Sequence, residues 1–237
     1  MRTRLLLALA GLSLMAFLLP AGAGPFRAAE DEMRAAYADY RAALFRTNQS
    51  DAAGSRATID AFRAKWTVLV AAWSRQAPPQ YSDDGELGST LRDVSATAEE
   101  AAKLTEAGRL ADAHEVLERI RDQLSALRAR NGVRSFSDPV NAYHEQMEKV
   151  LLGAYDGLSA QGLAALRDDI AVLEHLAAEL GKPGPWNRPA GVDAALPPLR
   201  ASIAAVRTAL SGADRDALRA AIKALKPPFA RMFLQFG

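Results

Sequence analysis

Apolar residues recur three and four positions apart along most of the chain, and this spacing constrains the fold more than any other feature. The segment that begins at Leu110 is typical, because Ala113, Leu117, Ile120 and Leu124 all fall on one face of a helix. Ala, Leu, Arg and Glu are abundant and β-branched residues are few, which also favours helices. The sequence therefore predicts an all-α fold.

The helical pattern occurs twice, with helix-breaking loops and turns at the same places in each half. Each half has a proline-rich loop between its second and third predicted helices, and a glycine turn, at Gly108 or Gly212, between its third and fourth. Helix breaks at matching positions indicate an internal repeat. We therefore predict two tandem antiparallel four-helix bundles, at residues 26–132 and 138–237, joined by the segment from Asn131 to Ser137.

Composition excludes several classes of protein. The 237 residues include no cysteine, which excludes disulfides, thiolate metal sites and covalent haem attachment. The 29 basic and 28 acidic residues alternate along the chain, which argues against nucleic-acid binding. The chain also has no H-x-x-x-H pair, Gly-rich phosphate loop or Ser-His-Asp spacing, so we expect a protein that is not an enzyme.

The first 23 residues have the pattern of a secretory signal. Arg2 and Arg4 precede the apolar run Leu5–Leu19, and Pro20 is followed by the small residues of 21–23. A membrane anchor is the alternative, but fifteen apolar residues are short for a membrane span. We expect cleavage after position 23 and a mature, periplasmic chain that does not span the membrane.

Each half resembles cytochrome b562, the haem-binding four-helix bundle of the bacterial periplasm. The resemblance lies in an early Met on the first helix, a proline-rich loop at mid-length and a polar turn before the last helix. The residues that carry it are Met33, Pro78, Pro79, Lys103, Leu104 and Gly108 to Ala113 in the first half, and Met147 and Leu210 to Ala217 in the second. It covers most of the chain after residue 23 and implies the bundle fold and the compartment.

The resemblance also implies haem b held by a Met on the first helix and a His on the last. Met33 and Met147 match the Met position. The position of the His falls near Arg128 in the first half and near Met232 in the second, so this chain departs from the family at that ligand. We therefore expect haem b less than a bound metal ion.

The most suggestive set of side chains for binding is His144, Met147 and Met232. His144 and Met147 share one helix face, and the start of the first helix lies at the same end of a bundle as the end of the last. One imidazole and two thioethers form a soft ligand set suited to copper(I). Core packing of both methionines is the alternative interpretation.

The remaining aromatic and histidine residues have simpler interpretations. Tyr37, Tyr40, Trp66 and Trp73 fall on apolar faces and are expected in the core, whereas His114 and His175 are expected at the surface. Arg128, Arg130 and Arg134 cluster near a helix end, where they would offset the macrodipole.

We therefore expect a non-catalytic binding protein that holds copper in the second bundle. A cofactor-free interaction module is the alternative. It would dock another periplasmic or membrane protein through the bundle surfaces and the Trp186 loop.

Overall fold

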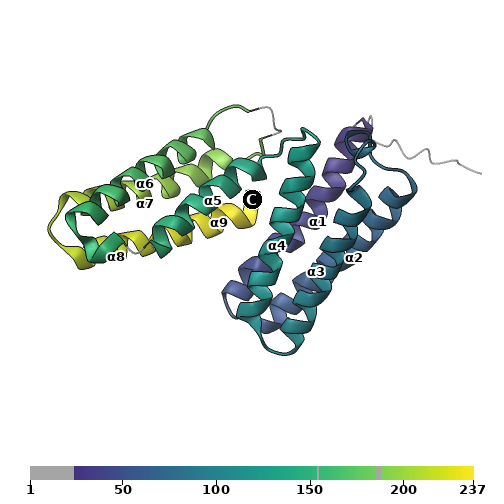
Figure 1. The fold of residues 1–237 in the computed structure, drawn as a ribbon, viewed down its shortest axis with the longest axis horizontal. Coiled ribbons are helices and arrows are strands. Elements are labelled where there is room, and N and C mark those ends of the chain that lie inside the picture. The colour runs from purple at the N-terminus through teal and green to yellow at the C-terminus, as the bar shows by residue number, and fades with distance from the viewer. Residues whose placement is uncertain (1–23, 154, 185–187) are drawn as a thin grey trace, which may run out of the picture.

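The computed structural model describes residues 24–153, 155–184 and 188–237, and within these ranges all regular secondary structure is helical (Figure 1). The all-α class is therefore confirmed. The expected signal segment at 1–23 and Trp186 lie outside the described residues. Among those described, no helix is both long enough and apolar enough to cross a membrane.

The first helix group consists of α1 to α4, which follow one another in the chain and pack together (Figure 1). Their bounds are Pro25–Asn48 for α1, Ala52–Arg75 for α2, Leu87–Glu106 for α3 and Leu110–Arg130 for α4. A short 3-10 helix, η1 at Pro79–Tyr81, lies in the proline-rich loop between α2 and α3. Helix α1 packs against α2 and α4, and α3 packs against α2 and α4.

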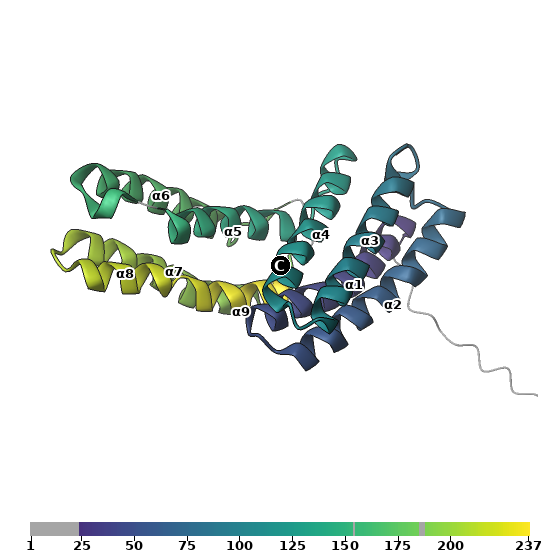
Figure 2. The same cartoon turned by 60° about the horizontal axis from the view of Figure 1, so that its bottom comes forward.

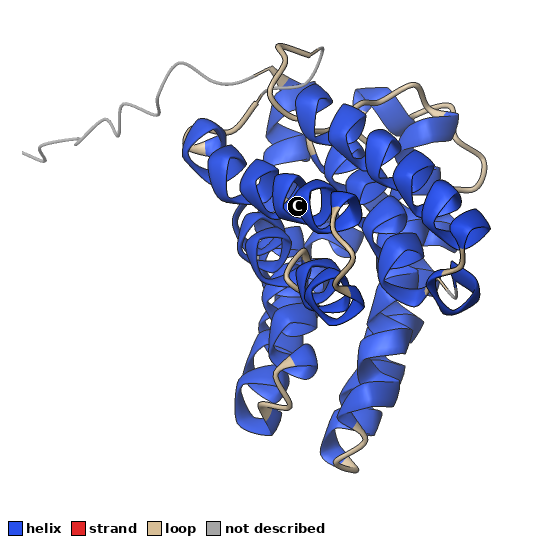
Figure 3. Ribbon diagram, turned by 90° about the vertical axis from the view of Figure 1, so that its left-hand side faces the viewer, coloured by secondary structure: helices blue, strands red, loops and turns tan. Residues whose placement is uncertain are grey.

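The second helix group consists of α5 to α9, with a short 3-10 helix, η2, at Tyr155–Leu158. The bounds are Ser137–Leu152 for α5, Ala160–Glu179 for α6, Val192–Ser211 for α7, Arg215–Lys223 for α8 and Lys226–Phe236 for α9. Figure 2 shows α5 and α6 along one side of this group and α7, α8 and α9 along the other. The view in Figure 3 shows the helices of both groups with short loops between them.

Local chemistry explains where several helices begin and end. The carboxylate of Asp51 accepts a hydrogen bond from the backbone of Gly54 at the start of α2, and Asp214 caps α8 in the same way. Ser159 caps α6 through its hydroxyl. Gly108 follows α3 with a φ of 75°, a left-handed conformation that glycine adopts without steric cost.

The last predicted helix is two helices in the structure. The chain leaves regular helix at Ala224 and Leu225, and Pro227 and Pro228 occupy the first turn of α9. Proline has no N–H and therefore breaks the hydrogen-bond ladder inside a helix, but the first turn has no such requirement. The fourth helix predicted for residues 138–237 is therefore divided into α8 and α9.

The cores of both groups contain the residues that the apolar spacing selects. Tyr37, Tyr40, Trp66 and Trp73 are all at most 4% exposed, which confirms their prediction as core residues. Phe62 stacks on Trp66 with ring centroids 5.7 Å apart. In the second group the buried face of α6 packs against α7 and α5 packs against α9.

The two groups meet where α9 lies against α1. Arg41 of α1 is 8% exposed, and its guanidinium donates hydrogen bonds to the carbonyl oxygens of Leu234 at 3.3 Å and Gly237 at 2.5 Å. A cation at the C-terminal end of a helix is favoured because the last carbonyl groups have no partner inside the helix. Arg41 therefore joins the end of α9 to the middle of α1.

Candidate functional site

The structure brings two of the three predicted copper ligands to one pocket. His144 and Met147 of α5 both line a pocket of about 520 Å³ at the meeting of α1, α4, α5 and α9. We call it the junction pocket. Met147 and Met232 are each only 1% exposed. Among the described residues, the α9 side chains that line the pocket include Phe229 and Phe233 but not Met232, which belongs to the core.

Charged and titratable side chains dominate the polar part of the junction pocket. They come from helices of both groups. Helix α4 contributes His114, Glu115, Glu118 and Arg121, α5 contributes His144, Glu145 and Glu148, and α9 contributes Lys226. Four carboxylates against two permanent cations give the pocket a negative balance when the imidazoles are neutral. Such a pocket attracts cations.

The histidines of α4 and α5 belong to the same local motif, His-Glu-x-x-Glu. Residues 114–118 read HEVLE and residues 144–148 read HEQME. Side chains four residues apart share a helix face, so each histidine lies beside the second glutamate of its motif. His114 Nε2 is 3.7 Å from Glu118 Oε1, and His144 Nε2 is 3.6 Å from Glu148 Oε1. Two His–Glu pairs on separate helices therefore line one pocket.

Arg121 connects the two pairs. Its Nη1 lies 2.6 Å from Glu118 Oε2 and 2.8 Å from His144 Nδ1, so one cationic nitrogen bridges a carboxylate of α4 and an imidazole of α5. Arginine can only donate, so His144 Nδ1 is the acceptor. In a neutral His144 the proton is therefore on Nε2, which faces Glu148. Interaction with His144 lowers the pKa of Glu148 and keeps that carboxylate charged.

His114 has the opposite tautomer, because Thr47 of α1 fixes its other nitrogen. Thr47 Oγ1 lies 2.9 Å from His114 Nδ1 and also 3.0 Å from the carbonyl oxygens of Ala43 and Leu44. The one hydroxyl proton goes to a backbone carbonyl, so Thr47 accepts from Nδ1–H of His114. The Nε2 lone pair then faces the carboxylate of Glu118.

A lone pair that faces a carboxylate is a favourable place for a cation. Burial lowers the pKa of His114, against the opposing effect of Glu118, so the neutral form with its free lone pair is favoured. A histidine that binds a metal commonly donates its second N–H to a protein acceptor, which fixes the tautomer and the ring orientation. His114 and Thr47 have this arrangement.

An aromatic wall holds His144 from the α9 side. The ring of Phe229 is stacked on the imidazole with centroids 5.0 Å apart and an interplanar angle of 5°. Phe233 lies 6.2 Å from the same ring. His144 is consequently fixed in orientation by Phe229, Arg121 and Glu148 together, and its side chain is only 15% exposed.

The third histidine provides a comparison within the same chain. His175 and Glu179 of α6 also form a pair at four-residue spacing, with 3.9 Å between Nε2 and Oε1. The His175 side chain is 69% exposed, which confirms its prediction as a surface residue. His114 is less exposed than predicted: its side chain is 30% exposed and contacts Thr47.

Sequence reasoning weighed each histidine singly and therefore missed the site's composition. The available signal was the repeated His-Glu-x-x-Glu motif on two predicted helices. Thr47 and Arg121 could not be found in this way, since their roles depend on contacts between helices.

The haem arrangement implied by the family resemblance does not fit the residues of the first group. Met33 Sδ lies 3.9 Å from Nη2 of Arg128, the residue near the expected position of the His ligand. A guanidinium is a donor only and does not ligate iron. Arg128 lies in the last turn of α4, as predicted, but it is 4% exposed and sits over the ring of Tyr37.

The junction pocket contains imidazole nitrogens and carboxylate oxygens that could bind a metal ion, but they are not yet arranged around one point. Within the described part of the chain, no three His, Asp or Glu side chains already stand in a metal-binding arrangement. Arg121 occupies the position between Glu118 and His144 that a bound cation would share. The chain matches no protein-family model, and comparisons with curated proteins and with solved structures gave no significant match.

Proposed function

We propose that this chain is an exported, non-catalytic binding protein that takes a divalent transition-metal ion in the junction pocket. The ligands are His114 and Glu118 of α4 and His144 of α5, which binds through Nδ1, while Glu148 orients His144 by accepting from its Nε2–H. The observation that carries the proposal is the bridge made by Arg121, in which one cationic nitrogen contacts Glu118 and His144 at once. A metal ion would take over this charge and add the lone pair of His114.

The ligand chemistry favours zinc, iron(II) or copper(II) over copper(I). Imidazole and carboxylate donors suit these ions, whereas copper(I) prefers thioether and thiolate sulfur. The copper(I) set expected from the sequence keeps His144 and Met147 but needs Met232, which packs in the core. Loss of binding on removal of Met232 would therefore favour copper(I) and the thioether set.

The proposal includes two further elements that rest on the sequence pattern. One is export to the periplasm, supported by the basic and apolar pattern of residues 1–23. The other is a division into two tandem four-helix bundles at 26–132 and 138–237, supported by the packing of α1 to α4 on one another and of α5 to α9 on one another. The metal would then lie between the two bundles rather than inside the second.

Metal titration of the mature chain tests the site. Zinc binding is measured by calorimetry, and cobalt(II) binding by its visible absorption. We expect one site per chain, and a loss of about tenfold or more in affinity for His114→Ala and for His144→Ala. The isosteric variants Glu118→Gln and Glu148→Gln should weaken binding while circular dichroism shows an unchanged helix content.

His175→Ala is the matched control, because it removes a histidine from an identical but exposed His–Glu pair. Its affinity should equal that of the wild type. The proposal fails if the folded wild-type chain binds neither zinc nor cobalt(II), or if His175→Ala weakens binding as much as His114→Ala does.

A further inference from the structure

A second, larger cleft lies at the other end of the same junction. It has a volume of about 820 Å³ and is lined by α1, the segment between α4 and α5, and the end of α9. Its α1 residues extend from Phe26 to Arg41, whereas those of the junction pocket are Leu44, Phe45 and Asn48. The two hollows are therefore distinct and follow one another along α1.

Five arginines line this second cleft, and we call it the arginine cleft. They are Arg27, Arg34, Arg41, Arg128 and Arg134, and the acidic side chain that lines the cleft with them is Glu30. Arg34 is paired with Asp31, and Arg41 is engaged by carbonyl groups of α9. Arg27 and Arg134 are exposed, and neither takes part in an ion pair within the described residues. The cleft consequently carries a positive balance.

Arg128 is the deepest of these cations. It is 4% exposed, and its Nη1 donates to Ser137 Oγ at 2.7 Å, while its Nε has no hydrogen-bond partner. Arg128 forms an ion pair with Asp138, whose Oδ1 is 3.5 Å from Nη1 but accepts no hydrogen bond. A buried donor with no partner is costly, and an anion that accepted from Nε of Arg128 would remove this cost.

A second buried cation shares the same aromatic ring. The guanidinium carbons of Arg41 and Arg128 lie 5.7 Å and 5.5 Å from the ring centroid of Tyr37. The ring attracts both cations through its π-face, but the two like charges repel each other. An anion that reached Arg128 from the cleft would relieve this repulsion.

Apolar side chains provide a surface for the rest of a ligand. Phe26 is 50% exposed, and it lines the cleft together with Phe136 and Phe236. Ligand sites commonly combine an apolar wall with a few polar groups that fix orientation. This combination of groups suits a molecule with one anionic end and one apolar or aromatic end.

We infer that the arginine cleft binds a small organic anion whose carboxylate or phosphate pairs with Arg128 and whose apolar body packs on Phe26 and Phe136. Arginine suits both head groups, because its planar fork of N–H donors matches carboxylate and phosphate oxygens. Arg27 and Arg134 attract the anion at the rim. This site is separate from the proposed metal site.

Binding of four probes to the mature chain in metal-free buffer tests the inference. Benzoate and phenyl phosphate carry the two anionic head groups, benzyl alcohol carries the same ring without charge, and benzylamine carries a positive charge. Calorimetry or chemical-shift titration should show saturable binding of at least one anion, with at least about tenfold weaker binding of the neutral and cationic probes. The preferred anion identifies the head group.

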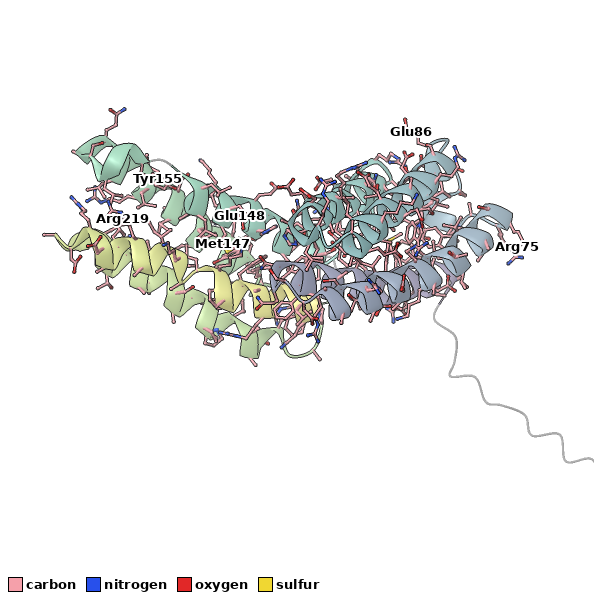
Figure 4. The ribbon with its side chains drawn as sticks, turned by 90° about the horizontal axis from the view of Figure 1, so that it is seen from below. Arg75, Glu86, Met147, Glu148, Tyr155 and Arg219 are labelled. Carbon is pink, nitrogen blue, oxygen red and sulfur yellow. The ribbon has the colours of Figure 1, made fainter. Side chains whose placement is uncertain are left out.

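Variants show whether the anion sits at Arg128. Arg128→Gln should weaken anion binding by about tenfold or more. The double variant Arg27→Gln/Arg134→Gln changes only exposed side chains, so it should fold normally and still weaken binding. Arg75→Gln and Arg219→Gln are the controls, since both residues lie at outer ends of the molecule (Figure 4), and they should bind like the wild type.

Two results would overturn the inference. One is equal affinity for benzyl alcohol and for the anions, and the other is unchanged anion binding in both the Arg128→Gln and the double variant. Metal binding at the junction pocket is measured separately on the same proteins, so failure of one proposal is distinguishable from failure of the other.

Discussion

Thr47 of α1 accepts a hydrogen bond from Nδ1 of His114, 67 residues further along the chain on α4, at a distance of 2.9 Å. The contact fixes which imidazole nitrogen faces Glu118 and the junction pocket. Thr47 is 3% exposed, so water does not readily replace it. The orientation of a proposed metal ligand thus depends on a residue that the pocket itself does not include.

Thr47→Val should weaken metal binding by roughly 10–100-fold, which is the usual effect of removing a partner that orients a ligand. The substitution keeps the shape of the side chain and removes only the hydroxyl. Thr58→Val is the control, because Thr58 makes the same kind of backbone hydrogen bond on α2. If the two variants bind zinc with equal affinity, Thr47 does not orient His114.

Met232→Ala should lower the free energy of unfolding by about 2–5 kcal/mol, as expected for a buried methionine reduced to alanine. It should not change zinc affinity, since the proposed ligands are His114, Glu118 and His144. Denaturant unfolding and calorimetry measure the two quantities on one preparation. Met232→Leu, which restores most of the volume, should recover most of the stability.

Arg41→Gln should lower the free energy of unfolding by about 2 kcal/mol, because it removes charged hydrogen bonds to the end of α9. Proteolysis should also cut α9 faster in this variant. Arg34→Gln is the control: its ion pair with Asp31 is exposed and contributes at most about 0.5 kcal/mol. Equal stability of the two variants would show that Arg41 does not hold the groups together.

Asp84 should make the stability of the first helix group depend on pH in the acid range. Burial alone would raise the pKa of Asp84, but hydrogen bonds from Asn131, the Glu86 backbone and Arg130 outweigh it and lower the pKa. The stabilisation is therefore present above the unfolded-state pKa of about 3.9 and is lost as the pH falls through the folded-state pKa.

Asp84→Asn should accordingly lower stability by about 1–3 kcal/mol at neutral pH and reduce the slope of stability against pH below about pH 4. Unfolding curves between pH 2 and pH 7 give both values. Asp83→Asn, at the exposed neighbouring position, should leave the curve unchanged. A steep acid slope that persists in Asp84→Asn would assign the effect to other carboxylates.

The fragment of residues 26–132 should fold alone, with helical circular dichroism and a cooperative melt. It contains α2 to α4, nearly all of α1 and the aromatic core around Trp66. Residues 138–237 should also fold, with lower stability, because they lose Arg41 and expose the α9 face that packs on α1. If neither fragment melts cooperatively while the whole chain does, the proposed division into two bundles is wrong.

The apolar spacing predicted the core well, because a helix face is a local property of the sequence. Leu117, Ile120, Leu124 and Leu127 of α4 are all at most 1% exposed, as their spacing indicates. The turn at Gly108 was equally predictable, because glycine readily adopts the positive φ that the chain has there. The break before Pro227 was recognisable in principle from the missing N–H of proline.

The site was only partly predictable, because its polar partners come from other helices. His144 was selected from its own helix, but its partner Arg121 lies on α4 of the other group. The position of Arg128 near a helix end was predictable, but its burial by contacts with Tyr37 and Ser137 was not. Such contacts depend on how helices distant in sequence pack, and residue spacing within one helix does not encode this.

Arg121 has a consequence for how the proposed site would work over time. Its guanidinium neutralises the charge of Glu118 and so reduces repulsion among the carboxylates of the pocket. An arriving metal ion must displace this tethered cation, and the net affinity is the difference between two favourable states. The displaced Arg121 side chain would stay close and compete with the ion for Glu118 and His144, which would speed release of the ion. A metal ion bound at the proposed site would therefore be released more readily than from a site with no competing cation.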